Sequence, residues 1–187
     1  MNANTREEIM AAAKAAVQTH GYNALSFRDI AAAVGVKSSS VHYHFPTKGD
    51  LATALAERYA TQAQEFLDDL QAKSLPHDQL MRAYIAAFRG ALEDDNKMCL
   101  CGIMAAEYAD LPDEVRKEVD RFTTVNHQWL AKVLFARHPK TPTEATEARA
   151  IAIFAAIEGA QLVARGKHDI RLFDRIIEAY IVSGLLS

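Results

Sequence analysis

The chain has 187 residues and a formal net charge of −3, and half of its residues are hydrophobic. This length permits one large domain or a small domain attached to a larger one, because domains usually hold about 100–200 residues. No apolar run reaches the roughly 18 residues that indicate a membrane-spanning helix. The N-terminal segment lacks a signal-peptide pattern. Two cysteines provide no disulfide framework, so we expect a cytoplasmic protein.

The charge is unevenly distributed along the chain. Residues 1–50 hold five basic and four acidic side chains, so their net charge is +1. The remaining residues hold 16 basic and 20 acidic side chains, so their net charge is −4. A slightly positive segment joined to an acidic body is compatible with a protein that approaches DNA with one end only. This difference in net charge is small, and it does not by itself indicate DNA binding.

Helical periodicity and capping residues predict three short helices at the N-terminus. The first ends at Gly21, the second is capped by Ser26 and ends at Gly35, and the third runs from about Ser38 to His44. Their apolar positions predict a small shared core, made of Ile9, Ala13, Val17, Phe27, Ile30, Ala31, Val34, Val41 and Phe45.

The rest of the chain is also predicted to be helical. Thr47 caps a fourth helix that extends to about Ala72, and Ser74–Pro76 reads as a hinge. Beyond it the pattern predicts helices at about 77–95, 98–110, 112–138, 143–167 and 169–185. No stretch alternates as a strand would, so the predicted fold class is all-α.

The segment FRDIAAAVGVKSSSVHYHF, from Phe27 to Phe45, has the layout of a helix-turn-helix. Three serines begin its second helix, where hydroxyl and N–H groups favour phosphate oxygens. The end of this helix carries three large side chains, His42, Tyr43 and His44. A helix this short does not need such large side chains for its stability. A generic three-helix subdomain is the alternative. A metal site at His42 and His44 is disfavoured, because positions two apart diverge by about 200° on a helix.

Three segments resemble the N-terminal domain of the TetR family of bacterial transcriptional repressors: TREEIMAAA, GYNALSFRDIAAAVGV and SSSVHYHFPTKGDL. The resemblance covers residues 5–51 and implies an all-α, nine-helix homodimer that binds an operator in double-stranded DNA and a small-molecule effector. It divides the chain into a helix-turn-helix domain, 1–50, and a helical effector-binding and dimerisation domain, 51–187.

The resemblance also assigns DNA-contact positions. Two differ from many members of the family: Ser38 stands where a lysine is frequent, with Lys37 one place earlier, and His42 replaces a common tyrosine. The predicted contacts are Ser26, Arg28, Lys37, Ser38, Ser39, Ser40, His42, Tyr43 and Lys48.

The family's effector domain is variable, so candidate ligand residues are taken from the sequence itself. Large or polar groups on the central helices either form the core or line a cavity. A buried Glu107, His127 or Glu158 needs a partner, which is a ligand or a neighbouring helix. The predicted ligand residues are Tyr84, Phe88, Cys99, Met104, Glu107, Tyr108, Trp129 and Phe154.

Cys99 and Cys101 lie in the run MCLCGIMAAEYADLPDEVR. Both are read as small buried hydrophobes or, for Cys99, as a thiol activated by the first turn of a helix and by nearby Lys97. The run is similar to the start of the sixth helix in a TetR branch that senses electrophiles or oxidants through cysteine, with Cys99, Glu107 and Leu111 aligned.

The last two predicted helices present apolar surfaces suited to a second copy of the chain. Those surfaces comprise Ile153, Ala156, Ile157, Gly159, Ala160, Leu162 and Val163, followed by Phe173, Ile176, Ile177, Tyr180 and Ile181. The sequence has no catalytic, cofactor-binding or metal-ligating motif. We therefore expect a ligand-responsive repressor that binds a palindromic operator as a dimer and is released by a small hydrophobic or electrophilic effector. The alternative is a helical protein-interaction module that does not bind DNA.

Overall fold

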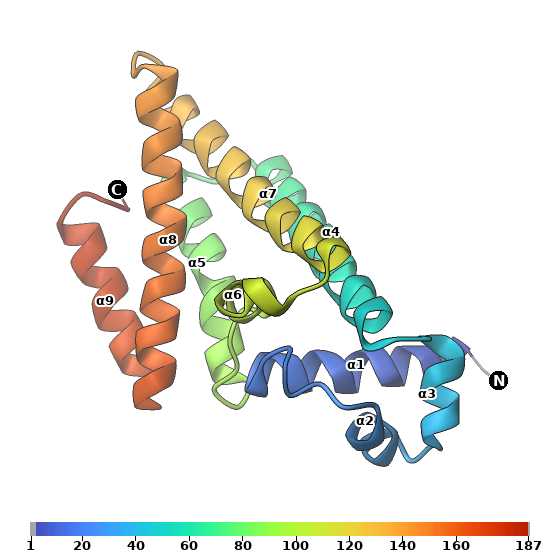
Figure 1. The fold of residues 1–187 in the computed structure, drawn as a ribbon. Coiled ribbons are helices and arrows are strands. Elements are labelled where there is room, and N and C mark those ends of the chain that lie inside the picture. Colours follow the sequence, from blue (N-terminus) through green and yellow to red (C-terminus); the bar gives the residue numbers. More distant parts are fainter. Residues whose placement is uncertain (1–2, 187) are drawn as a thin grey trace. The chain divides into compact units, whose positions relative to one another are not determined.

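The computed structural model describes residues 3–186, which contain nine α-helices, one short 3₁₀ helix and no strand (Figure 1). The predicted all-α fold class is therefore confirmed. In chain order the elements are α1 (Ala3–His20), α2 (Phe27–Val34), α3 (Ser38–His44), α4 (Lys48–Ala72), α5 (His77–Glu93), α6 (Leu100–Ala106), η1 (Tyr108–Asp110), α7 (Asp113–Arg137), α8 (Thr143–Lys167) and α9 (Ile170–Val182).

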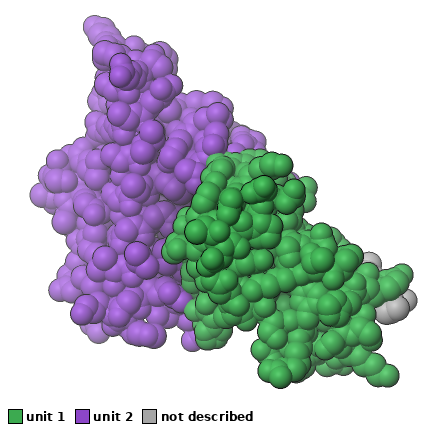
Figure 2. All heavy atoms as spheres, viewed as in Figure 1, with its two compact units in different colours: residues 1–61, 100–121 green, residues 62–99, 122–187 purple. Residues whose placement is uncertain are grey.

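The chain forms two compact units, coloured separately in Figure 2. Unit 1 comprises residues 1–61 and 100–121, and unit 2 comprises residues 62–99 and 122–187. Two long helices, α4 and α7, each begin in unit 1 and end in unit 2. The predicted division at residue 50 concerns function as well as packing, and it stays a prediction.

In unit 1, helix α1 packs against α2, α3 and α6. Burial of the apolar faces of these helices removes hydrocarbon from water and stabilises the unit. Seven of the nine core positions predicted for the three N-terminal helices are buried, while Phe27 and Val34 are half-buried. Thr47 caps α4 as predicted: Thr47 and Asp50 form a capping box, each accepting a hydrogen bond from the other's backbone N–H.

In unit 2, helices α5, α8 and α9 pack against one another. Arg89 of α5 pairs with Asp174 of α9 through two hydrogen bonds of 2.7 and 3.0 Å. Within the described residues, no helix is both long and apolar enough to cross a membrane.

Two of the sequence-based expectations are corrected by the structure. The single helix predicted at 98–110 is α6 followed by η1, and Cys99 precedes α6 instead of lying in its first turn. Part of the surface predicted for a second copy faces the chain's own core, because amphipathic spacing alone does not tell which of two faces a helix buries. The buried positions are Ile153, Ile157, Ala160, Phe173 and Ile177.

Candidate nucleic-acid interface and effector site

Helices α2 and α3 form the candidate DNA-reading element of unit 1. The Ser26 hydroxyl accepts a hydrogen bond from the Asp29 N–H and so caps α2. Gly35 ends α2 with φ at +75°, and its N–H donates to the carbonyl oxygens of Ala31 and Ala32. A residue without a Cβ adopts this left-handed conformation at little cost, which allows the tight turn into α3.

Most of the predicted DNA-contact side chains are open to solvent in the single chain. Tyr43 is 68% exposed, although it lies on a helix of only seven residues. The exposed members are Arg28, Lys37, Ser38, Ser39, His42 and Tyr43, and the half-buried members are Ser26, Ser40 and Lys48. The two helices therefore present a mixed surface of hydroxyl, basic and aromatic groups.

The three bulky side chains at the end of α3 have different environments. The His42 ring lies edge-on to Phe27 at 4.7 Å, and its Nδ1 is 3.3 Å from the carbonyl oxygen of Pro46. His44 is half-buried. Tyr43, the third, is largely exposed.

Lys48 occupies the first position of α4, as predicted, but its ammonium is held close to the protein. The Nζ donates to the Asn23 carbonyl oxygen at 3.1 Å and lies 4.3 Å from the centre of the Tyr22 ring. Burial lowers the pKa of Lys48, while the nearby Glu107 carboxylate opposes this effect. An approaching phosphate would meet an ammonium that is already oriented by these contacts.

Glu107 binds the turn between α1 and α2 within unit 1. Its carboxyl oxygens accept hydrogen bonds from the backbone N–H groups of Tyr22 and Asn23. At Gly21, with φ at +87°, a Cβ would lie 2.6 Å from Glu107 Oε2, so the carboxylate approaches the backbone closely because this residue is glycine. Sequence patterns did not reveal this contact, since its partners are 85 residues apart.

Five of the eight predicted ligand residues lie in unit 2, and the other three lie in unit 1. Of those three, Glu107 binds the turn just described and Met104 is fully buried. Tyr108 donates its hydroxyl to Asp120 at 3.0 Å, which raises the pKa of Tyr108. These contacts are structural, and the ligand role of the three residues stays a prediction.

The four aromatic candidates of unit 2 form one connected cluster. Tyr84 stacks on Trp129 with ring centres 5.0 Å apart and lies edge-on to Phe88 at 5.3 Å. Phe88 in turn contacts Phe154 at 6.3 Å. The Tyr84 hydroxyl donates to Asn126 Oδ1 at 2.9 Å. Three helices, α5, α7 and α8, thus contribute to a predominantly apolar site.

The fifth candidate, Cys99, is 2% exposed and faces polar groups of α8. Its backbone N–H donates to Gln161 Oε1 at 3.0 Å, and Gln161 Nε2 donates to the Phe88 carbonyl oxygen at 2.7 Å. Gln161 was missed in the sequence, although it continues the buried stripe of α8. It fixes the backbone of Cys99 beside α5.

Glu158 lies one turn before Gln161 on α8, and its carboxyl group is buried. Burial raises the pKa of Glu158 to about 7, and the Cys99 thiol, a weak donor, lowers it slightly. Burial also raises the pKa of Tyr84, and the charges of Glu158 and Cys99 add to that rise. The three side chains therefore form one interacting group.

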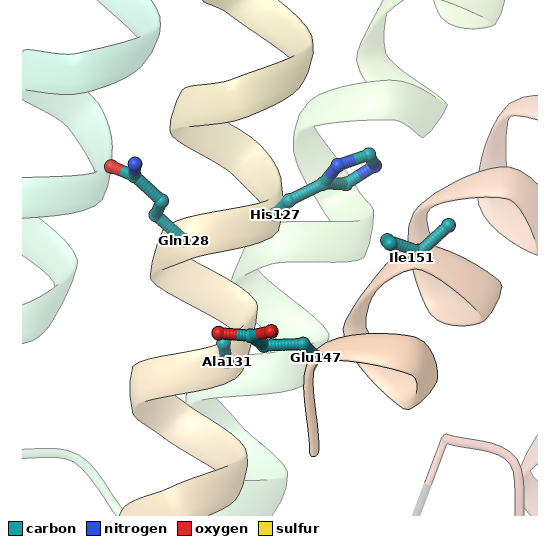
Figure 3. Close-up of a pocket in the computed structure, with 5 residues that line it drawn as sticks. All are labelled: His127, Gln128, Ala131, Glu147 and Ile151. Atoms are coloured by element: carbon teal, nitrogen blue, oxygen red, sulfur yellow. The ribbon is translucent and has the colours of Figure 1, made fainter. Parts of the chain in front are cut away.

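A surface groove of about 200 Å³ lies between α7 and α8 (Figure 3). His127, Gln128 and Ala131 line it from α7, and Glu147 and Ile151 line it from α8. His127 also lies edge-on to Phe154 at 5.1 Å. Burial lowers the pKa of His127, so its neutral form is favoured. The groove thus adjoins the aromatic cluster through these two rings.

The part of the chain that the structure describes contains no group of three or more His, Cys, Asp or Glu side chains suited to a metal ion.

Two family descriptions match this sequence. "Bacterial regulatory proteins, tetR family" matches residues 9–55, which include α2 and α3. "Transcriptional regulator LmrA/YxaF-like, C-terminal domain" matches residues 77–179, which include the aromatic cluster and more than half of the chain. A search of curated proteins found no match.

Solved structures with the same fold cover nearly the whole chain. A TetR transcriptional regulator from Legionella pneumophila is 30% identical, with 98% of this chain and 97% of that chain covered and a TM-score of 0.88. A TetR-family regulator from Agrobacterium tumefaciens is 29% identical, with 96% and 97% covered and a TM-score of 0.88. Escherichia coli NemR in its reduced form, 19% identical over 94% of both chains with a TM-score of 0.72, shares the fold alone.

Proposed function

Because the chain belongs to the TetR family of bacterial transcriptional regulators, we propose that it is a cytoplasmic repressor that binds a palindromic operator as a dimer and is released by a small hydrophobic effector. Family members are transcription factors and not enzymes, and they bind DNA and small molecules. The observation that carries the repressor proposal is the exposed face of α2 and α3 in a chain that also holds a buried aromatic cluster.

In this proposal α3 enters the major groove of DNA. Ser38 and Ser39 begin the helix, where they contact phosphate oxygens, and Tyr43 reaches base edges or phosphates from its far end. Arg28 and Lys37 add positive charge on either side of the turn. Two copies of this element, one in each subunit, read the two halves of a palindrome.

The exposed face of α8 supports a homodimer. Leu162 and Val163 are 56% and 50% exposed, and Ala155 and Gly166 lie on the same side of the helix. A Cβ added at Gly159 or Gly166 would meet nothing within 4 Å, so the chain's own packing does not require small residues there. Small residues let a second helix approach closely, as a two-fold interface requires.

Helix α4 connects the two functions in our proposal. It begins at Lys48 beside the DNA-reading element and continues beyond Thr61 into the unit that holds the aromatic cluster. An effector that changes the position of α4 alters the separation of the two reading elements. Coupling is reciprocal, so an effector that weakens DNA binding must also bind the DNA complex less tightly.

Replacing Tyr43 by alanine tests the assignment of the reading helix. We expect Tyr43→Ala to weaken binding to the DNA upstream of the protein's own gene about tenfold, because a side chain that contacts bases contributes about 1–3 kcal/mol. We expect Lys37→Ala to make log K less dependent on log salt by about 0.9 for each phosphate that the lysine neutralises. Fluorescence anisotropy at several salt concentrations measures both changes.

Matched controls for this test lie in unit 2. Phe135 is an exposed aromatic residue of α7, and Lys140 is an exposed base in the loop before α8. Phe135→Ala and Lys140→Ala should bind DNA as the wild type does. Unchanged affinity in Tyr43→Ala together with an unchanged salt dependence in Lys37→Ala would refute the proposed DNA face.

The same DNA assay tests whether the effector acts by covalent chemistry at Cys99. The thiol is 2% exposed and lies beside the Glu158 carboxyl group. We expect N-ethylmaleimide to react slowly with the native protein and to leave operator binding equal in the wild type and in Cys99→Ser. Rapid release of DNA by the wild type alone would instead identify Cys99 as an electrophile sensor.

A further inference from the structure

Two polar side chains of the aromatic cluster are buried without satisfying their hydrogen-bonding capacity. Neither carboxyl oxygen of Glu158 has a hydrogen-bond partner of normal geometry among the described residues, and the same is true of the indole N–H of Trp129. Buried polar groups in native proteins are nearly always paired, so each exception calls for an explanation such as a missing water or ligand.

Among residues 3–186, no cation acts on Glu158 strongly enough to neutralise it. Burial is the main cause of its raised pKa, and the weak thiol donor Cys99 is the one group that opposes it. Tyr84 is close enough to sense the charge of Glu158, but its hydroxyl already donates to Asn126. The carboxyl group therefore has vacant acceptor positions on both oxygens.

Aromatic rings lie next to this carboxyl group. Tyr84 interacts electrostatically with Glu158 and stacks on Trp129, and Phe88 lies edge-on to Tyr84. Aromatic faces attract cations as well as flat hydrocarbon. A buried carboxylate with vacant acceptor positions on both oxygens suits a donor that carries a positive charge and two parallel N–H groups.

We propose that Glu158 anchors an effector that is an aromatic organic cation, of the amidinium or arylammonium type, whose ring packs against Tyr84, Phe88 and Trp129. This inference rests on the proposed function, since it specifies the effector of the same regulator. The cation pairs with the two Glu158 oxygens, and an acceptor on the ligand or a bound water meets the Trp129 N–H. In this proposal the ligand reaches the cluster from the groove lined by His127, whose ring contacts Phe154.

Benzamidine and its neutral isostere benzamide test the proposed effector class directly. Trp129 is the only tryptophan in the chain, so its fluorescence reports binding at this site. We expect benzamidine to bind at least about tenfold more tightly than benzamide, because charge-assisted hydrogen bonds are roughly twice as strong as neutral ones. We expect Glu158→Gln to abolish this preference while benzamide binding changes little.

Glu144→Gln is the matched control, because Glu144 is an exposed carboxylate on the same helix and does not line the groove. It should retain the preference of the wild type for benzamidine. Equal binding of the two probes, a preference that survives in Glu158→Gln, or no binding of either probe would overturn the proposed effector class.

Operator binding without any probe separates this inference from the proposed function. Intact operator binding with no preference for benzamidine overturns only the effector class. Absence of specific DNA binding in the wild type would overturn the repressor itself. A thermal melt of each variant shows whether it is folded when the probes are added.

Discussion

Glu158→Gln is expected to make the protein more stable at alkaline pH and to change its stability little at acid pH. Burial raises the pKa of Glu158 from 4.5 to about 7. Between these two values the folded protein keeps a proton that the unfolded chain has released. The free energy of unfolding of the wild type therefore falls as pH rises from about 4.5 to about 7, and it stays low above that range. Glutamine has no charge to bury, so the variant escapes this loss.

The size of the effect follows from the linkage between proton binding and folding. One pKa unit corresponds to about 1.4 kcal/mol. We therefore expect the stability difference between Glu158→Gln and the wild type to grow by about 2–3 kcal/mol between about pH 5 and about pH 8. Urea denaturation followed by circular dichroism at several pH values measures this difference.

Glu144→Gln again provides the control for this prediction. Glu144 is exposed on α8, so its replacement should not reproduce the rise in relative stability with pH that we expect for Glu158→Gln. Parallel pH profiles for the wild type and Glu158→Gln would mean that the carboxyl group is hydrated or paired in solution. The proposal for an aromatic cation would then lose its main support.

Local signals predicted much of the fold because they are local in origin. The cap at Ser26, the left-handed turn at Gly35 and the capping box at Thr47 each depend on residues a few positions apart. Seven of the nine core positions that helical periodicity predicted for the three N-terminal helices are likewise buried. The break between α6 and η1 was missed, because no proline interrupts the run from 98 to 110. The break accompanies the contact of Glu107 with a turn that is distant in sequence.

The candidate site could be predicted only in part. Sequence indicated that Tyr84, Phe88, Trp129 and Phe154 are core or cavity residues, and the structure joins them in one cluster. It also indicated that a buried Glu158 would need a partner, but partners belong to tertiary packing and leave no local pattern. Gln161 was missed for the same reason, since its two hydrogen bonds connect segments more than 60 residues away in sequence.

If two copies of the chain dimerise through α8, acidic groups placed on the exposed apolar face of that helix should separate the subunits. In Leu162→Glu/Val163→Glu, each subunit carries two acidic groups on the exposed apolar face, so a dimer would bury four like charges without partners. Burying unpaired charge is costly, and we expect the variant to be a monomer. Sedimentation equilibrium or light scattering measures its mass.

Loss of the dimer should also weaken operator binding strongly. A monomer reads one half-site, whereas the dimer adds the contacts of the second half-site without a second association event. We expect the affinity for the operator to fall by about 1,000-fold, which corresponds to roughly 4 kcal/mol, while each reading element stays folded. Anisotropy with the full operator and with a half-site distinguishes this from damage to the reading element, because half-site binding should persist.

Phe135→Glu introduces the same charge at another exposed apolar position, on α7. It should remain dimeric and bind the operator with the affinity of the wild type. If Leu162→Glu/Val163→Glu also remained a dimer, the interface would lie elsewhere on the chain. The small residues at Gly159 and Gly166 would then need another explanation, because the chain itself leaves open space beside them. The connection between α4 and the spacing of the two reading elements would have to be derived again from that other interface.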